Sequence, residues 1–135
     1  MGSVSTNIII CNDRDEILLH LRDNKPTILY PNTWALPGGY IEEGETPEQC
    51  ILREMTEELG MEFKDVSLFQ TAQRSYGFEY TFWIRASFRV EEVRLTEGQA
   101  IRWFARDQIE QMKLGYEDNA ILYDFFQLLS LERGC

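Results

Sequence analysis

Cysteine is scarce in this chain of 135 residues, and the three that occur, Cys11, Cys50 and Cys135, lie far apart. Their odd number and wide spacing exclude a disulfide framework and a zinc site built from neighbouring thiols. Cys50 falls at an apolar position of its segment and is expected in the core. We therefore predict reduced thiols, as in a cytoplasmic protein.

Positive charge is the second deficit. Lysine and arginine together number 13, against 23 aspartates and glutamates, which gives a formal net charge of −10 and a pI of about 4.5. A surface this acidic repels a polyphosphate backbone, so DNA or long RNA is not expected as a partner. A small phosphorylated substrate is compatible with this charge when metal cations screen it locally.

Long apolar runs are absent as well. No stretch approaches the roughly 20 apolar residues of a membrane span, so no membrane partner is expected. The opening MGSVSTNIII has no basic region before its short apolar run, which is not typical of a signal peptide. With 44% apolar and 13% aromatic residues the chain can fill one core, and its length suits a single domain over residues 1–135.

Apolar and β-branched residues alternate or cluster in several short segments. They predict strands at residues 6–11, 16–22, 66–74, 79–90 and 100–104. Helices are predicted after Thr46 and at residues 106–113 and 117–131. Residues 23–33 contain Pro26 and Pro31 and are expected to form a loop long enough to be functional. Strands on either side of a central helix, with another helix at the end, predict an α+β fold.

The central helix carries its own boundary signals. Thr46 is a good N-cap, Pro47 suits the first helical position, and Gln49 can complete a capping box. Gly60 is expected to end the helix in a left-handed conformation. An apolar stripe at helical spacing is expected to face the core, formed by Ile51, Leu52, Met55 and Leu59.

The same helix has an acidic face. Glu54, Glu57 and Glu58 stand at i, i+3 and i+4, so they share one side of the helix. Like charges at this spacing cost only about 0.2–0.5 kcal/mol per pair, so a solvated surface is one explanation. Convergent carboxylates also suit hard cations such as Mg²⁺, which can polarise a phosphoryl group and activate a water molecule.

The residues around this face favour the metal site over the solvated surface. Gly38 and Gly39 precede the helix and allow close approach of the backbone to a ligand or another segment. Glu45 lies just before the N-cap. Arg53 lies inside the acidic cluster, where it can pair with a carboxylate and fix its orientation.

These positions together resemble a known motif. Gly39, five residues, Glu45, seven residues and then Arg53-Glu54-Met55-Thr56-Glu57-Glu58-Leu59-Gly60-Met61 resemble the complete Nudix box. The preceding Trp34-Ala35-Leu36-Pro37-Gly38-Gly39 resembles the approach to the box in the MutT-like branch of the Nudix hydrolase superfamily. The resemblance implies a Nudix-type α/β/α sandwich with a mixed central sheet.

The resemblance also implies a reaction and a metal site. The expected reaction is hydrolysis of a nucleoside diphosphate linked to another group, X, with Mg²⁺ or Mn²⁺ as cofactor. The implied metal ligands are the side chains of Glu54, Glu57 and Glu58 and the carbonyl of Gly39. Glu45 would support the metal site through Arg53. Glu97 would be a further carboxylate at the site. Glu97 is equally well explained as a turn residue in water.

The implied catalytic residues are Glu54, Glu57 and Arg53. Either Glu54 or Glu57 activates the water in family members whose base lies in the box, whereas in other members the base lies on a loop.

Four residues outside the box are candidates for substrate binding. Arg22 either contacts phosphate or is a surface charge. Asn119 either reads a base through its amide or caps the last helix. Tyr76 and Phe78 either stack on a base or pack across strands. His20, a lone histidine between leucines, is expected to be structural.

A nucleoside triphosphate, including oxidised forms such as 8-oxo-dGTP, is the first substrate hypothesis. ADP-ribose, a nucleotide sugar or a dinucleoside polyphosphate comes next. The 5′ end of RNA is less expected because no basic track is evident. A non-catalytic Nudix sensor is a further alternative, although all box carboxylates are present. The expected assembly is a monomer or homodimer.

Overall fold

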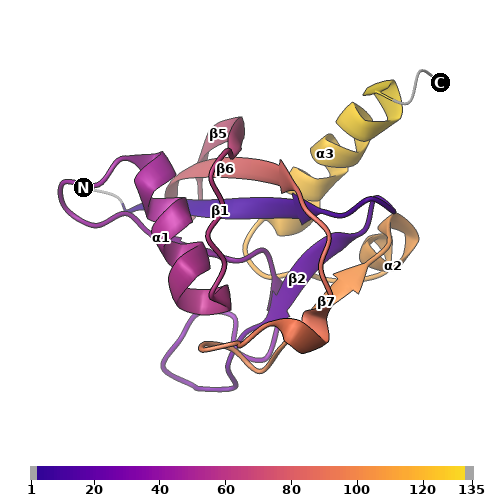
Figure 1. Cartoon of the computed structure of the whole chain (residues 1–135). Helices are drawn as coiled ribbons and strands as arrows, with labels where there is room; N and C mark the ends of the chain where they lie inside the picture. The colour runs from indigo at the N-terminus through magenta and orange to yellow at the C-terminus, as the bar shows by residue number, and fades with distance from the viewer. Residues whose placement is uncertain (1–2, 133–135) are drawn as a thin grey trace.

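Strand β1 (Val4–Cys11) lies at the centre of a mixed sheet in the computed structural model, which describes residues 3–132 (Figure 1). It pairs in parallel with β6 (Gly77–Arg85). It pairs antiparallel with β2 (Ile17–Leu21) and with β4 (Gly38–Tyr40). The sheet is therefore held together by pairings between segments that are distant in sequence.

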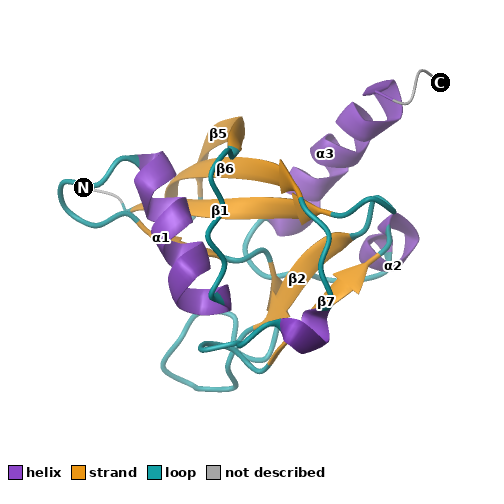
Figure 2. Ribbon diagram, viewed as in Figure 1, coloured by secondary structure: helices purple, strands orange, loops and turns teal. Residues whose placement is uncertain are grey.

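The remaining strands extend this sheet. β3 (Trp34–Ala35) and β7 (Ala100–Phe104) both pair with β2, and β5 (Ser67–Arg74) pairs with β6 at the other edge. Helix α1 (Pro47–Leu59) lies in front of the sheet and α3 (Asp118–Glu132) lies behind it in the view of Figure 2. The predicted α+β fold with a mixed central sheet is confirmed.

The alternation of side chains along β1 explains why both faces are covered. Ile8 and Ile10 belong to the core beneath α1, and Ile9 and Cys11 belong to the core beneath α3. All four side chains are completely buried. Successive residues of a strand point to opposite faces, so an uninterrupted apolar run requires a helix on each side.

Helix α1 begins and ends as predicted. The Thr46 side chain accepts a hydrogen bond from Gln49 N and the Gln49 side chain accepts one from Thr46 N, which completes the capping box. Pro47 occupies the first turn, and Gly60 has a left-handed backbone with φ of 66°. These local interactions fix where α1 begins and ends, and its buried residues Ile51, Met55 and Leu59 face the sheet.

The strand predicted at residues 79–90 is too long. β6 ends at Arg85, opposite Cys11, where β1 also ends. Beyond that point no described strand continues beside it, and the indole N–H of Trp103 instead donates to the carbonyl of Phe88 at 3.1 Å. The apolar residues that follow Arg85 cover the sheet as an irregular segment.

The helix predicted at residues 106–113 is also shorter in the structure, where α2 spans Arg106–Glu110. The Asn119 side chain explains its end. Its Nδ2 donates to the carbonyl of Met112 at 2.9 Å, and its Oδ1 accepts from the N–H of Leu114 at 2.8 Å. Both backbone groups are therefore satisfied outside a helix.

Strand β4 was not predicted, although Gly38 and Gly39 were expected to allow close approach of the backbone to a ligand or another segment. Gly38 pairs with Asn7 of β1. A β-carbon on Gly38 would collide with the backbone of Thr6 and Asn7. Glycine therefore allows β4 to approach β1 closely enough to pair.

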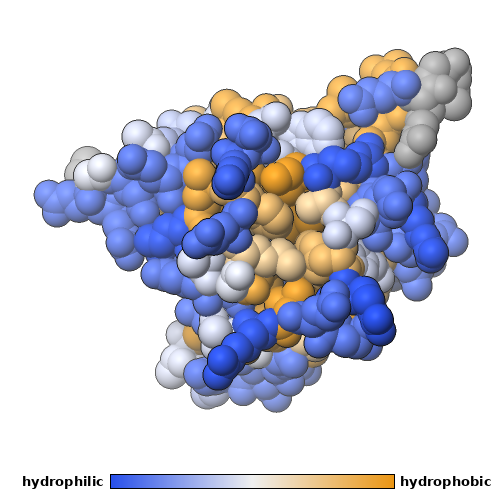
Figure 3. Space-filling view, in the orientation of Figure 1, coloured by the Kyte–Doolittle hydropathy of each residue, from blue (hydrophilic) through white to orange (hydrophobic). Residues whose placement is uncertain are grey.

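The face seen in Figure 3 has apolar side chains at its centre and polar side chains around them. Partly buried apolar residues such as Phe88, Val90 and Trp103 pack against the core beneath α1. Cys11 and Cys50 are completely buried, and Cys135 lies outside the described residues. Within residues 3–132, none of the helices has the length and hydropathy that a membrane span needs.

Candidate active site

A cavity of about 430 Å³ opens between α1, β4 and the ends of β1 and β2. It brings together residues that the sequence separates by as much as the whole domain. Seven of the predicted site residues line it: Arg22, Gly39, Arg53, Glu54, Glu57, Tyr76 and Glu97. Glu45 and Glu58 lie behind this lining, in contact with residues that form it.

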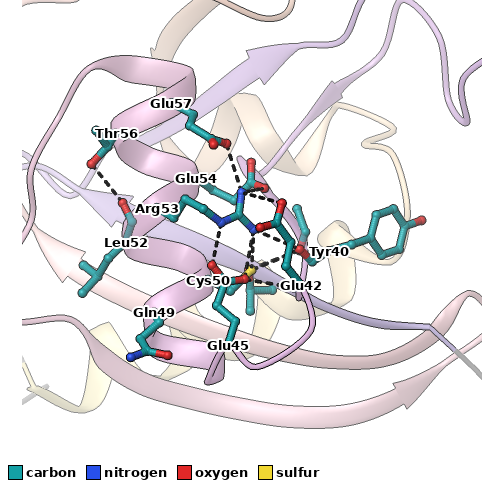
Figure 4. A network of polar contacts seen from close by, with 12 residues as sticks. Tyr40, Glu42, Glu45, Gln49, Cys50, Leu52, Arg53, Glu54, Thr56 and Glu57 are labelled. Atoms are coloured by element: carbon teal, nitrogen blue, oxygen red, sulfur yellow. Dashed lines mark hydrogen bonds and ion pairs between the residues drawn. The ribbon is translucent and has the colours of Figure 1, made fainter.

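Arg53 is the centre of a polar network at one end of the cavity (Figure 4). Its Nε donates to Glu45 Oε2 at 2.6 Å, and its Nη2 donates to Glu45 Oε1 at 3.0 Å. Its Nη1 lies 3.0 Å from both Glu54 Oε2 and Glu57 Oε2. The hydrogen bond from Arg53 lowers the pKa of Glu45 to about 2, so this carboxylate stays ionised.

The same guanidinium also bonds to the loop before α1. Arg53 Nη2 donates to the carbonyl of Tyr40 at 3.2 Å, and Glu45 Oε1 accepts from the N–H of Glu42 at 3.0 Å. Arg53 therefore joins the backbone after Gly39 to the helix that carries the glutamates. The predicted supporting role of Glu45 through Arg53 agrees with this geometry.

Gly39 lies directly against Glu54. A β-carbon on Gly39 would collide with the Glu54 carboxylate, so only glycine leaves room for this side chain. The Gly39 carbonyl accepts from the hydroxyl of Thr6 at 3.2 Å. Burial raises the pKa of Glu54, and the nearby Glu57 and Glu97 raise it further, although Arg53 partly offsets these effects.

Glu58 is the most buried of the box carboxylates, with 2% of the residue exposed. Its Oε2 has no hydrogen-bond partner among the residues that the structure describes. Burial, followed by the neighbouring Glu54 and Glu97, raises the pKa of Glu58 to about 9. A buried carboxyl without a partner is costly and calls for a compensating group.

His20 does not supply that compensating charge. Its Nδ1 lies 3.9 Å from Glu58 Oε1. Burial, together with the charge of Arg22, lowers the pKa of His20 to about 4, so the imidazole is neutral near neutral pH. The pair is therefore a contact between two uncharged groups, and the expectation of a structural histidine agrees with its burial in β2.

The carboxylates at this end could hold a hard divalent cation. The charge of Glu97 raises the pKa of both Glu54 and Glu58, and Glu54 also raises the pKa of Glu58. A bound cation relieves this repulsion between carboxylates. Their oxygens and the Gly39 carbonyl are the donor types that Mg²⁺ and Mn²⁺ prefer. In the conformation described, no three histidine, cysteine, aspartate or glutamate side chains of residues 3–132 converge as a metal site, and Arg53 engages both Glu54 and Glu57.

Aromatic residues and Arg22 form the opposite rim of the cavity. The Arg22 guanidinium lies over the Tyr116 ring, 5.2 Å from its centroid. Tyr116 in turn contacts Tyr76 and Tyr30, with ring centroids 5.0 and 4.7 Å apart. The predicted candidates Arg22 and Tyr76 therefore meet at one rim, although Tyr30 and Tyr116 were not foreseen.

The inner end of the cavity contains polar residues that the sequence analysis missed. Asp118 is 1% exposed, its Oδ2 accepts from the N–H of Leu36 at 2.8 Å, and its Oδ1 lies 3.5 Å from Asn7 Nδ2. Asn7 Oδ1 is buried and has no hydrogen-bond partner within the described part of the chain. Burial raises the pKa of Asp118 to about 8, so this carboxyl is mostly protonated at neutral pH and can donate a hydrogen bond.

Glu79 lies beside this inner end and completes the polar set. It accepts from the hydroxyl of Tyr76 at 2.9 Å and from Arg74 Nε at 3.2 Å. Burial raises its pKa. The sequence contains one signal that could have identified two of these residues. Asn7 and Glu79 are polar residues within otherwise largely apolar strands.

Two of the predicted substrate residues lie elsewhere. The Asn119 amide is bonded to backbone groups and lines a separate cavity between α2 and α3, so its position does not fit the predicted base-reading role. Phe78 packs against Tyr80, with ring centroids 5.3 Å apart, and is not part of the cavity lining. Phe78 and Tyr80 both belong to β6, so this contact lies within one strand and is neither base stacking nor the cross-strand aromatic packing considered as the alternative.

Comparison with known proteins agrees with this geometry. The family model described as the NUDIX domain matches residues 1–126. The RNA pyrophosphohydrolase of Actinobacillus succinogenes is 32% identical over 105 residues, which cover 74% of this chain and 46% of that protein. The chain spans about half the length of the curated relatives that it matches.

Solved structures show the same fold. The NUDIX domain of Shewanella oneidensis NrtR, complexed with ADP ribose, matches with a TM-score of 0.77 at 20% identity, over 96% of this chain and 89% of that one. The MutT NUDIX hydrolase from Burkholderia pseudomallei matches with a TM-score of 0.72 at 25% identity, over 91% and 97% of the two chains.

Proposed function

The chain belongs to the NUDIX domain family, and we propose that it hydrolyses a phosphoric anhydride bond in a small nucleotide with the help of a divalent cation. One observation carries this proposal. The carboxylates of the Nudix box gather at one end of a cavity, and the most buried of them, Glu58, has an oxygen without a partner among the described residues.

Glu54, Glu57 and Glu58, with the Gly39 carbonyl, would hold Mg²⁺ or Mn²⁺, and Glu97, which lines the same cavity, would be a further ligand. When bound, the cation supplies Lewis-acid polarisation of the phosphoryl group and lowers the pKa of a coordinated water. Glu54 and Glu57 share Arg53 Nη1 in the conformation described. A bound cation would therefore compete with Arg53 for the oxygens of these two carboxylates.

The remaining chemistry rests on the chain's own residues. A carboxylate of Glu54 or Glu57 accepts a proton from the attacking water, and the water oxygen bonds to phosphorus as the phosphate leaving group departs. Arg53 keeps these carboxylates aligned through its bonds to Glu45 and to the backbone of Tyr40. Fixed positioning of this kind lowers the entropy cost of reaching the transition state.

The other end of the cavity supports a nucleotide as substrate. Asn7 Oδ1 is an acceptor without a partner in the described residues, and the protonated carboxyl of Asp118 is a donor. A donor next to an acceptor is complementary to the edge of a nucleobase. Tyr76 and Tyr116 offer ring faces for stacking, and Arg22 offers charge for a phosphate. A nucleoside triphosphate, including oxidised forms, is therefore our first substrate.

The relatives favour a second candidate, the 5′ end of RNA. The protein that is 32% identical to this chain is named an RNA pyrophosphohydrolase. The net charge of −10 disfavours extended contact with an RNA backbone. A short 5′-triphosphorylated oligonucleotide would then be bound through its first nucleotide. ADP-ribose is a further substrate to test, because a structural neighbour was solved with it.

A nucleotide panel tests the proposal. Phosphate and pyrophosphate release would be followed with Mg²⁺ and nucleoside triphosphates, 8-oxo-dGTP, ADP-ribose, a nucleotide sugar, a dinucleoside polyphosphate and a 5′-triphosphorylated RNA. We expect turnover of at least one, and a fall in kcat of about 100-fold or more in Glu57→Gln. The exposed Glu62→Gln, just beyond α1, is the matched control and should retain full activity.

The panel also separates an enzyme from a ligand sensor. Tight binding of one nucleotide without turnover would reject hydrolysis and favour a sensor. Equal activity in Glu57→Gln and the wild-type protein would reject the role of the box carboxylates.

A further inference from the structure

The segment Thr96–Gln99 joins the two ends of the cavity. At its start, the Thr96 N–H donates to the carbonyl of Glu58 at 3.1 Å, and the Thr96 hydroxyl donates to the carbonyl of Glu57. At its end, the Gln99 N–H donates to the carbonyl of Leu21 at 2.8 Å. The segment therefore connects the last turn of α1, which carries the glutamates, to the end of β2, which leads to Arg22.

The side chain of Gln99 makes the connection to the aromatic rim. Its Nε2 donates to the carbonyl of Arg22 at 2.9 Å and to Asn32 Oδ1 at 2.8 Å. One amide group thus holds both ends of the loop formed by residues 23–33. Gln99 does not line the cavity, so any effect on substrate must pass through the groups that it holds.

Arg22 and the loop of residues 23–33 contribute side chains that surround Tyr116 at the aromatic rim. The Arg22 guanidinium lies over the Tyr116 ring, and the ring of Tyr30, within the 23–33 loop, contacts Tyr116 from another side. Tyr30 and Asn32 both have left-handed backbones, with φ of 49° and 55°. Residues other than glycine keep this conformation only where their surroundings hold it, and the hydrogen bond from Gln99 to Asn32 is one such restraint.

We propose that Gln99 is a positioning residue that sets nucleotide affinity by holding Arg22 and the 23–33 loop in place. This inference rests on the proposed function for the identity of the ligand, but the restraint itself is a property of the free protein. Loss of the restraint should loosen the rim while leaving the carboxylates on α1 unchanged.

The first test measures the restraint without substrate. Gln99→Leu removes both donors and keeps the side-chain size. In the free protein we expect faster hydrogen exchange at the amides of Arg22 and Asn32, which donate to Thr33 O and Asp23 O at 3.0 Å each. Gln127→Leu, at an exposed position of α3, is the matched control. Unchanged exchange at both amides in Gln99→Leu would overturn the proposal.

The second test measures the consequence for the ligand. In Gln99→Leu we expect KM for the preferred nucleotide to rise about tenfold, as fits the loss of two hydrogen bonds of an exposed side chain, with kcat within about twofold of the wild type. Gln99→Glu, which presents acceptors to two acceptors, should raise KM at least as much. A fall in kcat at constant KM would overturn the affinity role.

A double-mutant cycle links the effect to Asn32. Asn32→Gly removes the acceptor and keeps the left-handed backbone accessible. If Gln99 acts through Asn32, the double variant with Gln99→Leu should raise KM less than the product of the single effects. Strictly multiplicative effects would reject a path through Asn32. Should Gln99→Leu not fold, Gln99→Asn, whose amide is too short to reach both acceptors, takes its place in every measurement.

These outcomes separate this inference from the proposed function. If the wild-type protein hydrolyses no nucleotide of the panel, the proposed reaction fails. The positioning role is then decided by hydrogen exchange and by calorimetric affinity for the tightest-binding nucleotide, for which we expect the same tenfold weakening, about 1.4 kcal/mol, in Gln99→Leu.

Discussion

Arg53 donates to both carboxylate oxygens of Glu45, from Nε at 2.6 Å and from Nη2 at 3.0 Å, although the two residues belong to α1 and to the loop before it. The planar guanidinium matches the carboxylate fork, which makes such pairs directional as well as strong. Because the third nitrogen faces Glu54 and Glu57, the orientation of these two carboxylates depends on this one pair.

Arg53→Lys should therefore weaken both fold and site although it preserves the charge. A lysine cannot reproduce the bidentate contact. We expect the free energy of unfolding, measured with urea, to fall by about 1–3 kcal/mol. Arg89→Lys, whose exposed side chain lies 3.6 Å from Glu91, is the control and should change stability by less than about 0.5 kcal/mol. Equal stability of both variants would show that the fork geometry is unimportant.

Gly38→Ala and Gly39→Ala should have different consequences although the two glycines are neighbours. A β-carbon on Gly38 meets the backbone of β1, whereas one on Gly39 meets the carboxylate of Glu54. We expect Gly38→Ala to lower the unfolding free energy by about 1–3 kcal/mol. Gly39→Ala should lose hydrolysis with a smaller change in stability, because the Glu54 side chain can turn aside. Thermal unfolding and turnover measured on both variants test this, and the reverse pattern would contradict it.

Asp118→Asn should remove part of the pH dependence of stability. The pKa of Asp118 is about 8 in the folded protein against an ordinary value of 3.8, so the folded state holds the extra proton between these values. Ionisation of the buried carboxyl therefore makes wild-type stability fall as the pH rises through this window. The unfolding free energy of Asp118→Asn minus that of the wild type should rise by up to about 1.4 kcal/mol per pH unit and level off above the folded pKa.

Asp65→Asn, at an exposed position, is the control for this titration. Its unfolding free energy should change with pH in the same way as that of the wild type. Asparagine at position 118 keeps an acceptor for the N–H of Leu36, so gross rearrangement of this contact is not expected. A stability difference that does not vary with pH would mean that Asp118 is ionised in the folded protein.

Divalent cations should stabilise the protein through the box glutamates. A ligand that binds only the folded state at 100 times its Kd adds about 2.7 kcal/mol. We expect Mg²⁺ or Mn²⁺ to raise the Tm of the wild type after treatment with a chelator, and Glu57→Gln to need a higher concentration for the same shift. Glu62→Gln should respond like the wild type. An identical titration of Glu57→Gln would place the cation elsewhere.

Local signals made α1 predictable. Its capping box, proline and terminal glycine act within a few residues of one another, so the sequence alone fixes where the helix begins and ends. The spacing of Glu54, Glu57 and Glu58 then follows from helix geometry. The end of β6 could not be predicted in this way, because it depends on where β1, its distant partner, also ends.

The inner end of the cavity shows the same limit. Asn7 and Asp118 are 111 positions apart, and only the packing of α3 onto the sheet brings them together. The sequence drew attention to Asn119 rather than Asp118. One residue on a helix corresponds to a rotation of about 100°, which is enough to direct one side chain into the cavity and the next into a neighbouring one.

The parallel ladder between β1 and β6 also constrains how the chain acquires its fold. Val4 pairs with Phe78 and Cys11 with Arg85, so the central ladder is complete only once the chain has been synthesised as far as Arg85. Contacts that join such distant segments slow folding, since chain entropy is lost before they form. Until then the isoleucines of β1 lack their permanent neighbour, and a nascent chain stalled before β6 exposes an aggregation-prone strand to chaperones.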